Sequence, residues 1–134
     1  MTSINNKLLI ENIYTNIIKT SRNKSFFLDF NVDDTVEGRF DIIILHSFIV
    51  FNFFIHINDQ KSSLSQMLFD HMFRDFDSNL REMGFGDIAV NKRMKQFIKA
   101  FYGRIENYSK SLSQFTEFGD DKLLRETILR NIYK

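Results

Sequence analysis

Two ionisable side chains of the sequence have a spacing that could support metal chemistry. His71 and Asp75 are four residues apart, so in a helix they share one face with Glu82. A two-metal site in a helix bundle needs a Glu-x-x-His pair from each of two helices, and this spacing does not occur in the sequence. We therefore expect no metal ion, and we interpret these residues as a solvated or ion-paired helix face.

The motifs of common enzyme classes are missing from the sequence. There is no cysteine, hence no thiolate nucleophile and no disulfide, and there is no GxSxG, HExxH or P-loop pattern. His46 lies on the apolar side of its predicted helix and has no spaced partner, so we interpret it as a hydrogen-bonded core histidine rather than a haem ligand. The sequence predicts a binding protein without catalysis or a cofactor.

Two acid-to-base pairs lie on a second polar face of the helix that carries His71. Asp70 with Arg74 and Asp77 with Arg81 both have i, i+4 spacing. Such pairs are usually weak surface stabilisers. A charged docking surface for a partner protein is the functional alternative, and the sequence leaves both interpretations open.

The charge distribution is polarised although the net charge is only +1. Residues 90–110 carry six basic residues and one acid, whereas residues 25–41 carry five acids and one arginine. The small net charge argues against DNA binding. The basic run is either a solvated face or a surface for ribosomal RNA or anionic lipid. Its candidate residues are Lys92, Lys95, Lys99 and Lys110.

The elements that position these residues are helices. The sequence has no proline and five glycines, and its apolar residues recur with helical spacing. We predict an all-α fold, a single compact domain over residues 1–134 with about five helices around a buried central helix. The expected helices lie around residues 10–18, 35–57, 62–83, 90–115 and 122–133, with an irregular connection before the second.

The predicted central helix at residues 35–57 is apolar around most of its circumference. A membrane span is the alternative, but Asp41, His46 and Asn52 interrupt the apolar run. We therefore expect a buried helix of a soluble protein. The N-terminal residues do not have the pattern of a secretory signal, so we expect a cytoplasmic protein.

Helix ends are predicted from capping chemistry. Asp34 or Thr35 is expected to cap the central helix, and Asp87 is expected to cap the following helix, at about residues 90–115. Gly84 and Gly86 are expected to hold backbone conformations that a β-carbon would strain.

Four segments of the sequence resemble the signature segments of the ubiquinol-cytochrome c chaperone family. In chain order they are DDTVEGRFDIIILH, LFDHMFRDFDSNLREMGFGDIAV, KAFYGRIENY and LLRNIYK. The resemblance extends from about residue 26 to the C-terminus. Lys24 and Asp33 stand where the family usually has proline, which bears on the rigidity of the acidic connection.

The resemblance implies an all-α assembly chaperone for the cytochrome bc1 complex. In mitochondrial relatives such a protein binds newly made cytochrome b, works with a small partner protein and contacts the ribosome. The short form is similar to the alphaproteobacterial version, for which peripheral contact with the inner membrane is expected. Candidate partner-binding residues are Asp34, Arg39, Asp41, Asp70, Arg74, Asp75, Asp77, Arg81, Glu82, Asp87, Tyr102 and Arg104. Glycines expected to be structural are Gly38, Gly84, Gly86 and Gly103.

Overall fold

Helices form nearly all of the chain that the structure describes. The structure is a computed structural model and describes residues 2–56 and 62–133. In order, the helices are α1 (Thr2–Ser21), α2 (Ser25–Leu28), α3 (Val36–His56), α4 (Ser62–Glu82), α5 (Asp87–Phe118) and α6 (Lys122–Ile132). Five long helices and one short turn confirm the predicted all-α class. The predicted end of the central helix at residue 57 lies outside the described residues.

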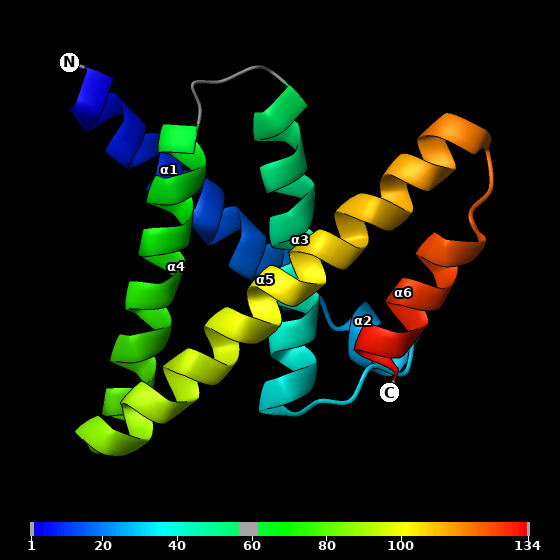
Figure 1. Ribbon diagram of the computed structural model, residues 1–134. Helices are drawn as coiled ribbons and strands as arrows, with labels where there is room; N and C mark the ends of the chain where they lie inside the picture. Colours follow the sequence, from blue (N-terminus) through cyan, green and yellow to red (C-terminus); the bar gives the residue numbers. More distant parts are fainter. Residues whose placement is uncertain (1, 57–61, 134) are drawn as a thin grey trace.

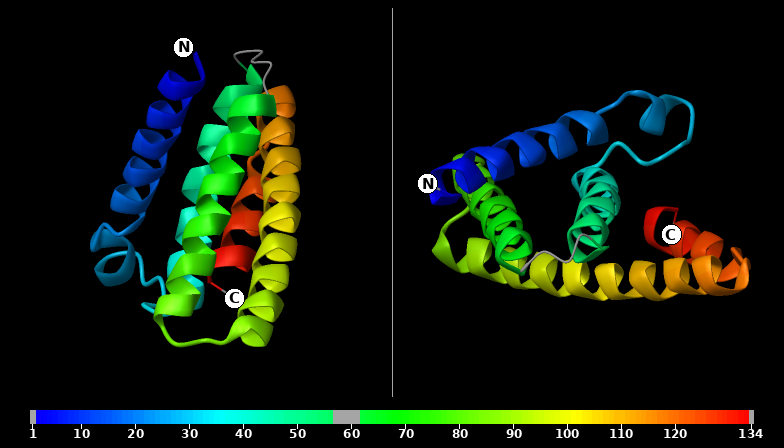
Figure 2. Two further views of the ribbon diagram at one scale, coloured as in Figure 1. Left: turned by 90° about the vertical axis from the view of Figure 1, so that its left-hand side faces the viewer. Right: turned by 90° about the horizontal axis from the view of Figure 1, so that it is seen from above.

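Helix α3 is the central element of the fold. It packs against α1, α4, α5 and α6 (Figures 1 and 2). Ile42, Ile44 and Ser47 are each at most 1% exposed, although they point in different directions around the helix axis. The neighbours on several sides explain why this helix is apolar around most of its circumference. Among the described residues, no helix is both long and apolar enough to cross a membrane.

Phenylalanine rings fill the space between α3, α4 and α5. The rings of Phe73 and Phe101 have centroids 5.4 Å apart and planes at 88°. Phe51 also meets Phe101 edge-on, at 5.6 Å. Edge-to-face pairs are favoured because the positive ring edge meets the negative ring face. A large part of the sequence's phenylalanine content therefore belongs to the core.

Helix α1 covers α3 and α4 from one side. Its apolar stripe includes Ile10, Tyr14 and Ile17, which are all buried, as predicted. The Tyr14 hydroxyl donates a hydrogen bond to Oδ2 of Asp75 at 2.6 Å. Burial, aided by this bond, raises the pKa of Tyr14 far above its usual value, so the phenol stays protonated and keeps donating. The helix begins at Thr2, earlier than the apolar stripe by itself predicts.

The connection between α1 and α3 contains a helical turn that was not predicted. Helix α2 is only four residues long, too short to show a periodic pattern. After it, Asn31 has a left-handed backbone with φ of 58°. This turn directs Val32 inward, where it packs with Ile42 and Ile132 in a second apolar cluster. The acidic connection is thus anchored to α3 and α6 without the prolines that the family usually has there.

Helices α5 and α6 form a helical hairpin on the other side of α3 (Figure 1). Gly119 ends α5 with φ of 73°, a conformation that glycine adopts without strain. Helix α5 is longer than predicted at both ends, because it begins at Asp87 and continues to Phe118. The prediction followed the apolar stripe, which does not include the polar or exposed residues of the first and last turns.

The structure confirms some of the predicted caps and corrects others. The Thr35 hydroxyl accepts a hydrogen bond from the Gly38 backbone N–H at 3.0 Å, so Thr35 rather than Asp34 caps α3. Gly84 has φ of +97°, as predicted. Gly86 was predicted wrongly, because its backbone is extended and a β-carbon there would meet no atom within 4 Å. Asp87 makes no capping hydrogen bond, since it is the first residue of α5 and its carboxylate points to α4.

The four predicted structural glycines therefore differ in their roles. At Gly38 an added β-carbon would lie 2.0 Å from the backbone oxygen of Asp33, so only glycine fits there. At Gly84 the positive φ is the constraint. At Gly86 and Gly103 a β-carbon would have open space, and the structure gives no packing reason for glycine.

Candidate functional site

The start of α3, the end of α4 and the start of α5 meet at one end of the bundle, in the lower part of Figure 1. A cavity of about 430 Å³ lies between them. Its lining residues are Val36, Glu37, Arg39, Phe40, Ile43, Phe76, Asn79, Leu80, Met83, Phe85, Arg93 and Phe97. Most of these come from two of the signature-like segments, residues 33–46 and 68–90, which are distant in sequence. The fold brings them together as the two walls of one site.

The inner wall of this cavity is aromatic. The Phe40 ring lies 4.5 Å from the Phe97 ring and 5.5 Å from the Phe76 ring, measured between centroids. Farther out, Val36 and Met83 are 54% and 62% exposed. The apolar surface therefore continues from the interior onto the rim. Aromatic and methionine side chains offer large, adaptable contact area to an apolar partner.

Arg39 and Asp34 form a charged pair on the rim beside α3. The Arg39 guanidinium donates to Oδ1 of Asp34 at 2.7 Å, and both side chains are more than half exposed. The hydrogen bond and charge of Asp34 raise the pKa of Arg39. Both residues were predicted as partner-binding candidates, and both lie on the surface next to the cavity.

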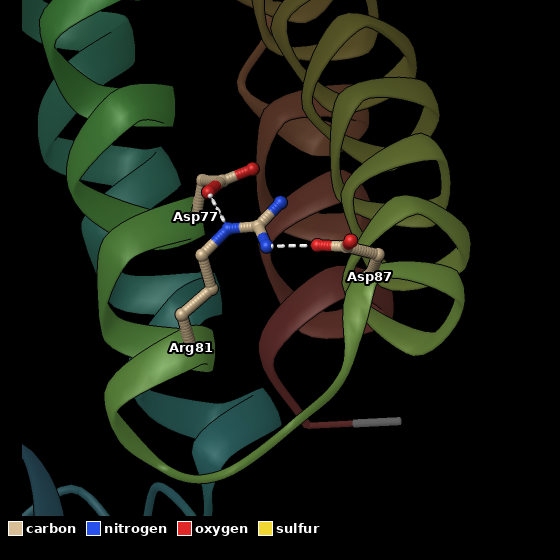
Figure 3. A network of polar contacts seen from close by, with 3 residues as sticks. All are labelled: Asp77, Arg81 and Asp87. Atoms are coloured by element: carbon tan, nitrogen blue, oxygen red, sulfur yellow. Dashed lines mark hydrogen bonds and ion pairs between the residues drawn. The ribbon is translucent and has the colours of Figure 1, made fainter.

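Arg81 links the end of α4 to the start of α5 (Figure 3). Its Nε donates to Asp77 at 2.7 Å, one turn earlier in α4, and its Nη1 donates to Asp87. These hydrogen bonds, first that to Asp87, raise the pKa of Arg81. The predicted Asp77–Arg81 pair is confirmed, and Asp87 extends it into a bridge across the turn. All three side chains remain substantially exposed, so the bridge is accessible to a partner.

A second hollow, of about 450 Å³, lies on the outer face of α4. It is lined by Phe69, Asp70, Phe73, Arg74 and Asp77. Tyr102 of α5 stacks on Phe69 at 5.3 Å and is 54% exposed. The predicted Asp70–Arg74 pair is wrong: Asp70 instead accepts a hydrogen bond from Gln66, and no such ion pair forms between these two described residues. The prediction failed because i, i+4 spacing permits a pair without imposing it.

Of the predicted partner-binding residues, Asp41 is buried and Arg104 is partly buried. Asp41 of α3 forms an ion pair with Arg104 of α5, and their side chains are only 4% and 17% exposed. Burial lowers the pKa of Arg104, but an arginine remains charged. The prediction that Asp41 and Arg104 contact a partner is therefore corrected, since the pair joins two helices of the core.

Asp75 also has an internal role, because it accepts the hydrogen bond of Tyr14 from α1. Asp75 therefore lies at the interface of α1 and α4, not on the predicted docking face. Glu82, the last residue of α4, is exposed beside the bridge of Arg81. His71 packs edge-on against Tyr14 at 5.0 Å, as a structural contact.

The predicted basic face lies on the solvent side of α5. Lys92, Lys95, Lys99 and Lys110 are all exposed. Lys110 pairs with Glu106 at 3.1 Å, one turn away on the same helix. The four lysines are therefore accessible, although one of them is partly neutralised.

His46 is hydrogen-bonded, as predicted, and lies partly buried. Its Nδ1 is 2.8 Å from the Ile42 carbonyl oxygen and 3.2 Å from the Ser21 hydroxyl. Within residues 2–56 and 62–133, no group of three or more histidine or acidic side chains is arranged to hold a metal ion.

An aromatic cavity with an exposed apolar margin and a charged rim has the anatomy of a protein-docking site. The fold defines the protein as an all-α helical bundle.

The chain belongs to the ubiquinol-cytochrome C chaperone family, whose sequence profile matches residues 28–134. It is also similar to the crystal structure of the Cbp3 homolog from Brucella abortus. The two share 33% sequence identity with a TM-score of 0.76, over 98% of this chain and 70% of that chain. No curated protein matches the sequence. The family resemblance of the four sequence segments is thereby confirmed.

Sequence reasoning did not find the cavity or the cation–π contact at its rim. Arg93 lies with its guanidinium carbon 4.5 Å from the centroid of the Phe85 ring. In the sequence Arg93 was one charge of a basic run, and Phe85 was part of a turn. The spacing of eight residues across a helix boundary has no periodic signal, although an aromatic residue between two glycines is itself unusual.

Proposed function

We propose that this protein is an assembly chaperone for the cytochrome bc1 complex, ubiquinol-cytochrome c reductase, and that its client is newly made cytochrome b. The match of the chain to the ubiquinol-cytochrome C chaperone family carries this proposal. The similarity to a Cbp3 homolog supports it. The role is one of binding, with no reaction of its own.

The cavity between α3, α4 and α5 is the client site in this proposal. Cytochrome b is an apolar membrane protein, so before insertion its apolar side chains need cover from water. Phe40, Phe76 and Phe97 offer an apolar wall, and Met83 offers an adaptable margin. The charged groups around the rim favour a correctly oriented client over other apolar segments.

Deletion of the gene tests the proposal. We expect less assembled bc1 complex and a weaker cytochrome b haem absorption in the membranes, both restored when the intact gene is supplied again. Cytochrome b should also co-purify with the tagged chaperone during active synthesis. Normal amounts of complex and haem signal in the deletion strain would contradict the proposal.

The exposed lysines of α5 favour a second candidate, an adaptor bound to the ribosome or to the cytoplasmic face of the inner membrane. Lys92, Lys95 and Lys99 form no ion pair among the described residues. Contacts to phosphate weaken steeply with salt, whereas an apolar client site does not. Reversal of the four lysines to glutamate should abolish co-sedimentation with ribosomes or anionic vesicles. Unchanged sedimentation would exclude this adaptor role.

A further inference from the structure

Two arginines line the cavity, Arg39 and Arg93. Arg39 is matched by a carboxylate of the protein itself, because it donates to Asp34. Its charge is therefore largely compensated within the molecule, and it offers no unmatched positive charge to a ligand.

The second arginine has a different environment. Arg93 lies over the Phe85 ring and, within the described residues, forms no ion pair. A cation over an aromatic face is attracted by the ring, and the planar guanidinium carries N–H donors that match a carboxylate. The contact with the ring restrains the group, and no carboxylate of the described residues forms an ion pair with it. The cavity has one preorganised, unmatched cation at its edge.

The apolar surface around the cavity indicates the size of the occupant. Val36 and Met83 line the cavity and are each more than half exposed, so their outer surfaces continue the apolar lining onto the rim. A small amphiphile held against the inner aromatic wall would leave these outer surfaces in water, whereas a protein segment lying across the opening would cover them. Protein interfaces commonly centre on such a buried anchor with a surrounding apolar margin.

We infer that this cavity binds a helical segment of the client in which an apolar anchor side chain is followed on the same face by an acidic residue, and that Arg93 pairs with that acidic residue. Glu37 lines the cavity from α3, whereas Arg93 lines it from α5, and Glu37 disfavours a carboxylate on its own side. The two charges together set the direction in which the segment lies. The inference rests on the proposed function for the existence of a client, and it adds the feature by which the client is recognised.

Two designed amphipathic helical peptides test this inference. They are identical except for one residue next to the apolar anchor, which is Glu in the first and Lys in the second. By fluorescence anisotropy, the wild-type protein should bind the Glu peptide about tenfold more tightly or better. Arg93→Gln should remove the preference for the Glu peptide, and Arg93→Glu should make the protein prefer the Lys peptide. Lys122→Glu on α6 changes the charge by the same amount as Arg93→Glu and serves as the control. This control variant should still prefer the Glu peptide.

A further variant, Val36→Glu, tests the apolar contact between the rim of the cavity and the client segment. Val36 is exposed at the first turn of α3, where a glutamate also favours the helix, so Val36→Glu should fold normally. It should weaken the binding of both peptides. Equal affinity of the wild type for the two peptides would overturn the inference, and so would equal effects of Arg93→Glu and Lys122→Glu. Full competition by laurate, with Val36→Glu binding the peptides normally, would indicate a small amphiphile instead and would also overturn it.

Overlapping peptides of cytochrome b from the same organism separate this inference from the proposed function. If the designed peptides show the expected preference and no cytochrome b peptide binds, the proposed client is wrong and the recognition rule is supported. If cytochrome b peptides bind with no dependence on an acidic residue or on Arg93, the recognition rule is wrong and the proposed client is supported.

Discussion

Arg104 of α5 donates a hydrogen bond to Asp41 of α3, and the two form a largely buried ion pair between these helices. The residues are 63 positions apart in the sequence, and each lies in a separate signature-like segment. Their pairing ties the long helix α5 to the central helix α3.

Removing one partner of this ion pair should lower the stability of the protein. In Asp41→Ala, Arg104 keeps its charge with little water to solvate it, and we expect the free energy of unfolding to fall by about 3–5 kcal/mol. Urea unfolding followed by circular dichroism measures this loss. The double variant Asp41→Leu with Arg104→Met removes both charges and should recover most of the lost free energy of unfolding. A stability of Asp41→Ala close to that of the wild type would show that the pair is not buried as described.

Gly38 and Gly103 provide a matched pair of glycine substitutions within helices. Gly38→Ala should lower the free energy of unfolding by about 1–3 kcal/mol, because its β-carbon collides with the backbone oxygen of Asp33. Gly103→Ala should raise it by about 0.5–1 kcal/mol, since alanine is the better helix former and the space is open. The two melting temperatures should therefore move in opposite directions. A shift in the same direction would contradict the close approach at Gly38.

The turn between α4 and α5 contains a second pair of glycines, whose substitutions should differ in their effect on stability. Gly84→Val places a β-branched side chain at φ of +97°, which should cost about 1–3 kcal/mol. Gly86→Ala should cost less, about 0.5–1 kcal/mol, because nothing lies within 4 Å of the added carbon and the loss comes only from alanine being a poorer N-cap than glycine. Thermal unfolding of both variants checks this difference. Similar losses at the two positions would show that the turn depends on both glycines.

The bridge of Asp77, Arg81 and Asp87 should act in docking more than in folding. Its members are substantially exposed, so Asp77→Lys and Arg81→Glu should leave the melting temperature nearly unchanged. Both should weaken the pull-down of the client or assembly partner, because they reverse charges on the exposed face of α4, where Asp77 lines the outer hollow.

A matched control for these variants lies on α6. Asp121 and Arg125 form an exposed i, i+4 pair of the same type, 3.2 Å apart and away from the cavity. Asp121→Lys and Arg125→Glu should affect neither melting nor pull-down. If the α4 variants unfold the protein, or if both pairs of variants behave alike in the pull-down, the docking role of the bridge is wrong.

The sequence by itself determined the helices, their order and the family. Helical spacing of apolar residues repeats over many turns, so α3, α4 and α5 could be located within a few residues at most ends. Helix α2 was not predicted, because a single helical turn is too short to show a periodic pattern of apolar residues. The same local chemistry identified Gly84, whose positive φ follows from the need to end a helix.

Only the tertiary structure decided which charged residues face a partner. Asp41 and Asp77 look alike in the sequence, yet one is buried against Arg104 and the other is exposed beside Arg81. The cavity likewise arises where the ends of three helices meet, and its edge is defined by Arg93 on Phe85. Periodicity describes the environment of a residue along its own helix, whereas burial and pairing depend on which face another helix covers, and that is set by packing between segments distant in the chain.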